Sequence, residues 1–298
     1  MTTEQEVVPV CWREWNEEGF FPGSDETEEA LANRVALCRG FAQRLAKDTD
    51  AAFPFKIAQR APDELLKEVL PLTEILYGIR PNWVPIFFSN RQLAPWHGGC
   101  AWIFQLDEEG PMAAILQLRM GFGSSSLLSR FYPRGELIAH ECAHIGRMLY
   151  EEPEFEEMLA YRASSSSWRR WWGPIVQSAR ESLAFVLILG GVVVANVWLA
   201  LWYPQYAGWW VEGVPFALVL VALLRLFHRH RIFNKCARHL EGLYPPHLSQ
   251  QLLYRLRDSE IRQFACLSSE EIRHFMDREA RLSFRWRFLK ALYPPISI

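Results

Sequence analysis

The sequence predicts an α+β protein that carries a two-helix transmembrane hairpin and ends in an all-α region. Three observations lead to this fold class. Residues 1–170 alternate helical patterns with short β-type runs, a long uncharged apolar stretch follows, and residues 228–298 show helical patterns throughout. We therefore expect an N-terminal domain over 1–170, a hairpin over 180–227 and a basic helical domain over 228–298.

Composition narrows the class of protein. The chain has 298 residues, of which 50% are hydrophobic and 22% charged, so it is neither disordered nor collagen-like. Six cysteines are scattered without a CxxC pair, which indicates reduced thiols rather than a disulfide framework. The N-terminal residues lack the basic and then apolar segments of a signal peptide. We expect the polar parts of the chain to stay in the cytoplasm.

The N-terminal part predicts helices and strands in a definite order. Each helix follows from apolar residues at helical spacing, and each strand from a short apolar run bounded by turn residues. A polar DEEG turn joins the last two strands into a hairpin. The expected helices are 27–47, 62–77, 134–150 and 153–163, and the expected strands are 83–89, 100–105 and 112–119.

The hairpin follows from charge and length. No Asp, Glu, Lys or Arg occurs from Ser182 to Val211. Residues 182–203 are long enough to cross a bilayer, and 213–227 reach a similar length if the preceding residues enter the interface. The link at 203–210 is uncharged and rich in Trp and Tyr, whereas basic residues flank the hairpin on both outer sides. We expect an integral membrane protein with two spans and both polar parts cytoplasmic, the bacterial inner membrane being the default location.

Charge is uneven along the chain although the formal net charge is only −2. Residues 1–181 carry 18 Lys and Arg against 26 Asp and Glu, whereas 228–298 carry 13 against 7. A basic helical tail can meet anionic lipid headgroups, so we expect the lipid bilayer as a partner. No nucleic-acid-binding motif accompanies this charge, which argues against a nucleic-acid partner. Ser268 and Glu271 form a capping box at the start of one of its helices.

The chemistry lies in residues 136–163. His140, Glu141 and His144 form an H-E-x-x-H motif inside a predicted helix. Positions i and i+4 lie on one helix face, so both histidines can bind a single Zn²⁺ ion. Glu141 lies beside them and can take a proton from a water molecule without being a ligand itself. The motif predicts a zinc site with a catalytic glutamate.

A catalytic zinc needs a third protein ligand, and the sequence offers Glu157. The histidine helix must end near Tyr150, and Glu157 lies about as far beyond the following turn as His144 lies before it. Glu154 and Glu156 are nearby alternatives. Glu156 is rotated by about 100° from Glu157 around the helix, so both are not expected to face the metal.

These residues resemble the gluzincin type of HExxH zinc metallopeptidase, in which a glutamate on a following helix completes the site. Glu157 lies in a Glu-x-x-Ala context, as in several members of that family. The resemblance covers about 28 residues and implies a zincin-like catalytic domain that cuts protein or peptide substrates. The membrane hairpin is similar to that of the HtpX and CAAX-processing peptidases in architecture only. In those families the ligand glutamate comes after the later spans, whereas Glu157 precedes the hairpin.

The resemblance also assigns roles to other positions. Many gluzincins have an acidic residue four positions after the ligand glutamate, which supports a zinc histidine, and here that position is Tyr161. We expect its hydroxyl to make the same bond or to stabilise an oxyanion. The cleft of a zincin runs beside an edge strand, for which 112–119 is the candidate. Arg147 is expected to pair with a glutamate of the turn at 151–157, and His97 is a candidate substrate contact.

Two other functions stay open. Peptide deformylases also use HExxH with an upstream Gly-Cys pair as third ligand, and Gly99-Cys100 lies forty residues before His140. The chain lacks their glycine-rich motif. A membrane-tethered scaffold or adaptor with a structural metal site is the non-enzymatic alternative, but such a site has no need of Glu141. We therefore expect a membrane-anchored zinc metalloprotease, whose tether favours membrane proteins or chains near the membrane as substrates.

Overall fold

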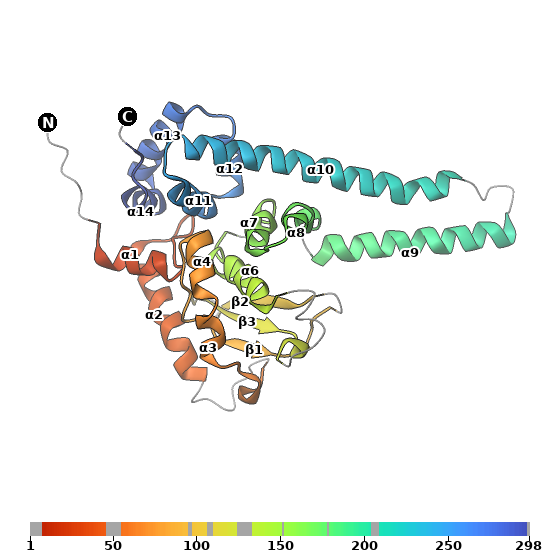
Figure 1. Ribbon diagram of the computed structural model, residues 1–298, viewed down its shortest axis with the longest axis horizontal. Helices are drawn as coiled ribbons and strands as arrows, with labels where there is room; N and C mark the ends of the chain where they lie inside the picture. Colours follow the sequence, from red (N-terminus) through yellow and green to blue (C-terminus); the bar gives the residue numbers. More distant parts are fainter. Residues whose placement is uncertain are drawn as a thin grey trace.

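The computed structural model describes residues 8–45, 55–94, 97–105, 110–123, 133–150, 152–177, 179–203 and 209–296. A body of helices packs around a small sheet, and two long helices project from it side by side (Figure 1). The α-helices are α1 Val10–Glu17, α2 Glu28–Leu45, α3 Asp63–Lys67, α4 Leu70–Tyr77, α6 Arg134–Gly146, α7 Glu156–Ala160, α8 Ser167–Trp172, α9 Ala179–Trp202, α10 Trp209–Glu241, α11 Pro246–Arg255, α12 Asp258–Phe264, α13 Ser269–Leu282 and α14 Phe284–Leu292. The strands are β1 Ile86–Phe88, β2 Gly99–Gln105 and β3 Met112–Leu118, and short 3-10 helices are η1 Ile57–Gln59, η2 Met120–Phe122, η3 Tyr161–Ala163 and η4 Gly173–Ile175.

A mixed α+β fold is therefore present, as the sequence predicts. The predicted helix at 62–77 is divided into α3 and α4. Pro71 lies in the first turn of α4, where its missing N–H group does no harm, and the helix cannot continue through it unbroken. The capping box at Ser268 is confirmed, since its backbone N–H donates to Glu271 Oε2 at 2.7 Å and its hydroxyl accepts from the Glu271 N–H.

The sheet has three strands in the order β1-β3-β2. β2 and β3 form the antiparallel hairpin expected from the sequence, with Gly99 opposite Leu118 and Gln105 opposite Met112. β1 pairs with β3 in parallel, Ile86 lying opposite Leu116. The middle of β3 is fully buried because strands and helices surround it.

The expectation that 112–119 forms the edge of the sheet is wrong. β3 is the central strand because the parallel pairing with β1 occupies its second side. The edge next to the metal-motif helix is β2, which packs against α6. β2 also shows the mixed, partly exposed burial of an edge strand. A peptide running along this side of the sheet would meet β2.

One hydrophobic core includes residues from both ends of the chain. Trp12 of α1 contacts Phe284 and Phe288 of α14, with ring centroids 5.4 and 5.5 Å apart. Tyr77 of α4 packs against Tyr254 of α11 at 4.8 Å. The segment before the projecting helices and the segment after them therefore fold against one another.

The projecting pair consists of α9 and the first part of α10, residues 209–227, which we call the apolar arm (Figure 1). Within the part of the chain that the structure describes, one helical segment, Glu181–Trp202, is long and apolar enough to cross a membrane, and none of its apolar window is buried. α10 continues from apolar residues into a basic stretch. The two-span hairpin, with its second span at 213–227, stays a prediction.

Candidate metal centre

Helix α6 presents the two histidines of the motif. It begins after Pro133 and carries Glu136 in its first turn, where a negative charge suits the helix dipole. His140 and His144 are one turn apart, and their Nε2 atoms lie 3.3 Å from one another. Both side chains are largely buried. Two ring nitrogens thus point to the same small volume.

Glu157 completes this group from the first turn of α7. Its carboxylate oxygens lie 3.5 Å from His140 Nε2 and 3.6 Å from His144 Nε2. The two histidine nitrogens have about the 3.4 Å separation expected of two ligands of a tetrahedral zinc ion, and Glu157 approaches each nitrogen with a different carboxylate oxygen. Among the described residues, these three side chains form the group that could hold a metal ion.

Glu156, the neighbour of Glu157, contacts the other nitrogen of His144. Its Oε1 lies 2.7 Å from His144 Nδ1. The rotation between the two glutamates, which argues against both facing a metal, instead brings each to a different nitrogen of the same ring. A carboxylate on the second nitrogen sets the tautomer and orientation of a metal-binding imidazole. Glu156 is therefore placed to orient His144.

Glu141 is buried beside this group. Burial raises its pKa to about 7, helped by the charge of Glu157 and opposed by that of His144. The backbone N–H of Ala101, in β2, also favours the charged form. A carboxyl group with a pKa near neutrality can both accept and release a proton.

The two histidines differ in charge preference. Burial and the neighbouring His144 hold the pKa of His140 well below its usual value, so it is neutral. Burial would also lower the pKa of His144, but the hydrogen bond to Glu156 and the charges of the surrounding carboxylates raise it to about 10. The pKa of Glu157 is itself raised, first by burial and then by Glu156. The cluster gathers more negative than positive charge.

Tyr161 follows α7 and packs on His140. Their ring centroids are 4.7 Å apart in an edge-to-face arrangement. Burial and the charges of Glu157 and Glu141 raise the pKa of Tyr161 to about 12. Within the described residues its hydroxyl makes no hydrogen bond to the two histidines. The side chain that supports a histidine is instead Glu156, which contacts Nδ1 of His144.

Cys100 and His97 lie at and before the start of β2. Cys100 is outside the group of possible metal ligands, and burial together with the charge of Glu141 raises its thiol pKa to about 11. His97 belongs to a loop that Arg119 holds in place by donating to the carbonyls of His97 and Ala94. Neither residue joins the cluster of His140, His144 and Glu157.

The C-terminal helices hold α6 at its end. The Tyr254 hydroxyl donates to the Ala143 carbonyl at 2.7 Å. Gly146 leaves room for this tyrosine, because a Cβ there would overlap the Tyr254 hydroxyl. Arg147 donates to the carbonyls of Tyr254 and Leu256 at 2.6 and 2.8 Å. The C-terminal part thus fixes the helix that carries both histidines.

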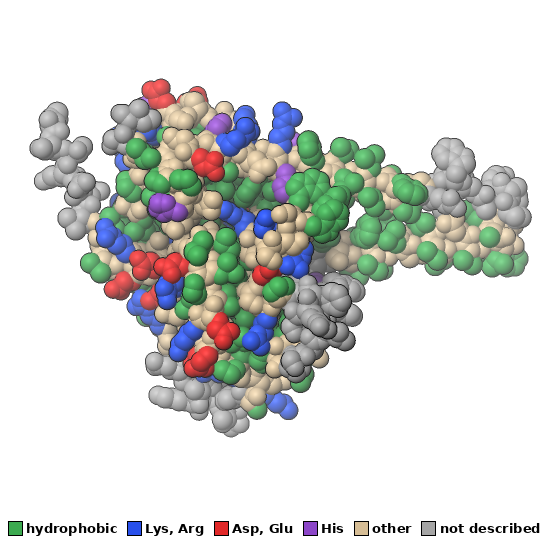
Figure 2. All heavy atoms as spheres, in the orientation of Figure 1, with side chains coloured by type: hydrophobic (Ala, Val, Ile, Leu, Met, Phe, Trp, Pro, Cys, Tyr) green, Lys and Arg blue, Asp and Glu red, His purple; other side chains and the backbone are tan. Residues whose placement is uncertain are grey.

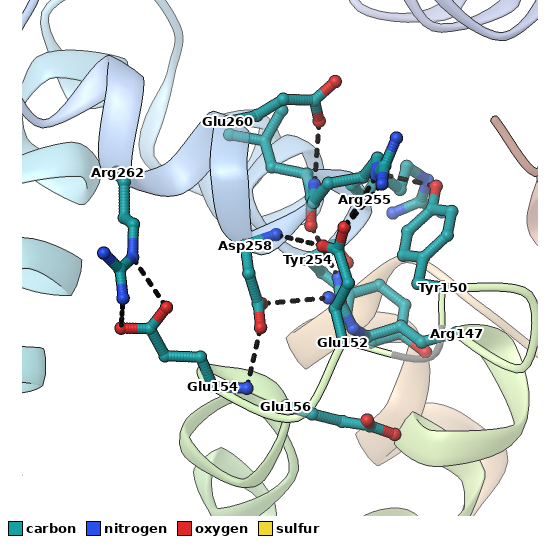
Figure 3. Close-up of polar contacts among 12 residues, drawn as sticks. Arg147, Tyr150, Glu152, Glu154, Glu156, Tyr254, Arg255, Asp258, Glu260 and Arg262 are labelled. Atoms are coloured by element: carbon teal, nitrogen blue, oxygen red, sulfur yellow. Dashed lines mark hydrogen bonds and ion pairs between the residues drawn. The ribbon is translucent and has the colours of Figure 1, made fainter.

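Arg147 is expected from the sequence to pair with a glutamate of the turn at 151–157, but among the described residues its ion-pair partner is Asp258, at 3.7 Å. The glutamates of that turn also reach the C-terminal helices (Figure 3). Glu152 pairs with Arg257, and Glu154 with Arg262, each at 2.7 Å. The reason is that the C-terminal helices pack over this turn, which local sequence does not reveal.

Sequence reasoning also missed the contact from α8–η4 to the site. Arg169 of α8 pairs with Glu136 of α6 at 2.6 Å. Gly173 lies against the Tyr161 ring so closely that a Cβ would overlap it. A glycine next to a tryptophan-rich stretch was the available signal for such a close approach.

Comparisons with known proteins bring no relative: no family model, curated protein or solved structure matches this chain. What the site can do chemically therefore follows from its geometry.

Proposed function

We propose that this protein is a membrane-anchored, zinc-dependent metalloprotease that hydrolyses peptide bonds at a site facing the cytoplasm. The observation that carries the proposal is the group of His140, His144 and Glu157, each of which offers one ligand atom within 4.8 Å of the others. Glu141, which follows His140 in α6, is buried beside this group. This arrangement is similar to the one that the resemblance to gluzincins implies, which supports the proposal.

The donor set suits zinc. Two imidazole nitrogens and one carboxylate leave a fourth position open, which is typical of catalytic rather than structural zinc. Carboxylates outnumber cationic groups around His144, so a divalent cation would balance the local charge. A zinc ion held here would polarise the substrate carbonyl and make water a better nucleophile at neutral pH.

The side chains divide the work. Glu141 takes a proton from the attacking water and passes it to the amine that leaves. Glu156 keeps His144 oriented through Nδ1. Tyr161, which stays protonated far above neutral pH, donates to the oxygen of the reacting carbonyl.

The edge strand β2 supplies a place for the substrate. Its start lies against Glu141: a Cβ at Gly99 would come within 3.4 Å of Glu141 Cγ. An extended peptide that adds to this edge would form main-chain hydrogen bonds and pass beside the metal ligands. Such binding is sequence-tolerant, because side chains contribute only through the pockets that they meet.

The apolar arm supports the anchoring. Because residues before and after it share one core, a chain whose α9 crosses a bilayer must cross back before Phe233, which is part of that core. The apolar start of α10 is the segment available for the return. Basic residues flank the arm at its base, which favours a cytoplasmic body.

The first experiment measures zinc per chain in detergent-purified protein. Wild type and Cys100→Ser should each hold one zinc ion, and Glu157→Gln should lose it. Loss in the Cys100 variant alone would move the third ligand to β2 and favour the deformylase-like function. A wild-type protein without zinc would favour the scaffold.

Activity is tested with fluorescently labelled casein as an unfolded substrate. Glu141→Gln should retain zinc but lose activity by about 10²-fold or more, because the proton carrier is gone. Glu154→Gln is the matched control, since Glu154 contacts Arg262 and not the cluster. Equal activity of Glu141→Gln and wild type would contradict the proposed mechanism.

A further inference from the structure

Helix α8 exposes a cluster of tryptophans at the base of the apolar arm. Trp168 is 67% exposed and Trp171 38%, and α8 has no buried residue. Trp172 contacts both of the other rings, with centroids 4.8 and 4.6 Å apart. Figure 2 shows hydrophobic side chains gathered where the arm leaves the body. Large aromatic side chains exposed together mark a surface that is covered by something.

Contacts with the arm fix how far this tryptophan cluster lies from the uncharged part of the arm. Arg225 of α10 pairs with Glu181, at the start of α9, at 2.9 Å, and this pair marks the end of the uncharged surface. Five residues further along α10, His230 stacks on Trp171 at 5.3 Å and contacts its carbonyl at 2.9 Å. Five residues of helix correspond to about 7 Å. The headgroup layer on each side of a bilayer has about this thickness.

Polar contacts hold the segment rigidly at that level. Arg170 donates to the carbonyls of Ser164 and Ser165, and Arg229 of α10 donates to the Pro174 carbonyl at 2.8 Å. The tryptophans are thus attached both to the body and to the arm. They cannot move away from the surface that surrounds the arm without breaking these bonds.

We propose that α8 and η4, residues Ser167–Ile175, form an interface platform that lies in the headgroup layer of the phospholipid bilayer and holds the metal centre next to the membrane surface. The occupant is lipid because the tryptophans continue the exposed apolar surface of the arm. Tryptophan rings favour this layer, where one side of the ring is apolar and the N–H meets water. This inference rests on the membrane anchoring of the proposed function.

The platform restricts the substrate. Arg229 also donates to the Glu154 carbonyl at 3.1 Å, in the turn three residues before Glu157. Arg229 lies four residues beyond Arg225, or about 6 Å along the helix, so the turn that leads to the metal ligands is attached near the apolar layer. The substrates are therefore chain segments that emerge from the same membrane face within a few residues of their own span.

The test uses the full chain in vesicles of brominated phosphatidylcholine, which quenches tryptophan fluorescence on contact. Subtracting the fluorescence of the triple variant from that of wild type gives the emission of the three platform tryptophans alone. The triple variant is Trp168→Phe/Trp171→Phe/Trp172→Phe. We expect this difference to fall at least twofold in brominated vesicles relative to ordinary ones. Trp168→Phe, a single change at an exposed ring, gives the same readout where the triple variant is poorly folded.

Two further variants separate the possible failures. The difference for Trp198→Phe/Trp202→Phe reports on α9, and that for Trp286→Phe reports on a buried ring of the body. Quenching of α9 without quenching of the platform would overturn the platform while leaving the anchor intact. If neither α9 nor the platform is quenched, both the membrane anchor and the platform are overturned. The metalloprotease activity on casein would still be decided by its own experiment.

Discussion

Two buried clusters of ionisable side chains adjoin the C-terminal half of helix α6, and they are built on opposite principles. At the metal centre, carboxylates gather around His144 with too few cations to balance them. In the second cluster, arginines are matched by acceptors: the fully buried Arg255 donates to the carbonyls of Tyr77 and Gln251 and to the Asn16 side chain. We call Tyr254, Arg255 and Arg285 the C-terminal clamp.

The difference teaches what each cluster is for. Arg285 of the clamp forms a two-bond ion pair with Glu260 at 2.7 and 2.8 Å, so its charge is satisfied within the fold. A satisfied buried network specifies one packing arrangement. An unbalanced one lowers stability unless a ligand compensates it. The clamp is thus structural, whereas the charge at the candidate metal centre fits the cation that the proposed function places there.

The largest effect is expected from breaking the clamp. Arg255→Met leaves several buried carbonyls without a donor, which should lower the free energy of unfolding by about 3–5 kcal/mol. Urea unfolding followed by circular dichroism measures it. Arg278→Met is the control, since Arg278 is 63% exposed and pairs with its neighbour Glu279. Equal stabilities of the two variants would show that the clamp is not a structural centre.

A smaller loss of stability is expected when the contact between the clamp and α6 is disturbed. Gly146→Ala forces the Tyr254 hydroxyl away from the Ala143 carbonyl and should lower the free energy of unfolding by about 1–3 kcal/mol. Gly40→Ala, in α2, meets no atom within 4 Å and should stabilise by about 0.5–1 kcal/mol. Shifts of the same sign in both variants would contradict the close contact.

The metal centre is tested by affinity rather than stability. Glu156→Gln removes the carboxylate that orients His144, so zinc affinity should fall by about 10–100-fold. Competition with a chromogenic chelator measures the dissociation constant. Glu152→Gln is the control, because Glu152 contacts the C-terminal helices instead. An unchanged affinity in Glu156→Gln would remove its orienting role.

The smallest effect is expected where the two regions meet at the surface. Glu154→Gln weakens the ion pair with Arg262, whose side chain is mostly exposed, so the free energy of unfolding should change by less than about 1 kcal/mol. Thermal unfolding measures the change. A loss comparable to that in Arg255→Met would mean that the turn, rather than the clamp, holds the C-terminal helices.

The sequence predicted local features well. The helical spacing of His140 and His144 and the position of Glu157 placed three side chains that do meet in the structure. The hairpin of β2 and β3 also followed from two short apolar runs and the polar turn between them. Each of these depends on residues that are close along the chain, where periodicity and turn chemistry decide the geometry.

Long-range pairing decided the rest. The edge strand was misplaced because β1 adds to β3 in parallel across an intervening segment, which no local pattern reports. Arg147 was given the wrong partner because Asp258 reaches it from a helix more than a hundred residues away. The prediction for Glu156 considered only its angle around the helix, whereas its side chain is long enough for the carboxylate to reach Nδ1 of His144.

The shared core also sets an order of events during synthesis. Residues up to 175 leave the ribosome first, but Tyr254 and Arg255, which secure the histidine helix, follow only after the whole apolar arm has been translated. The early part of the chain therefore lacks these contacts until the arm has been translated. For the membrane-anchored metalloprotease that we propose, this order would complete the metal centre only after the anchor has been made.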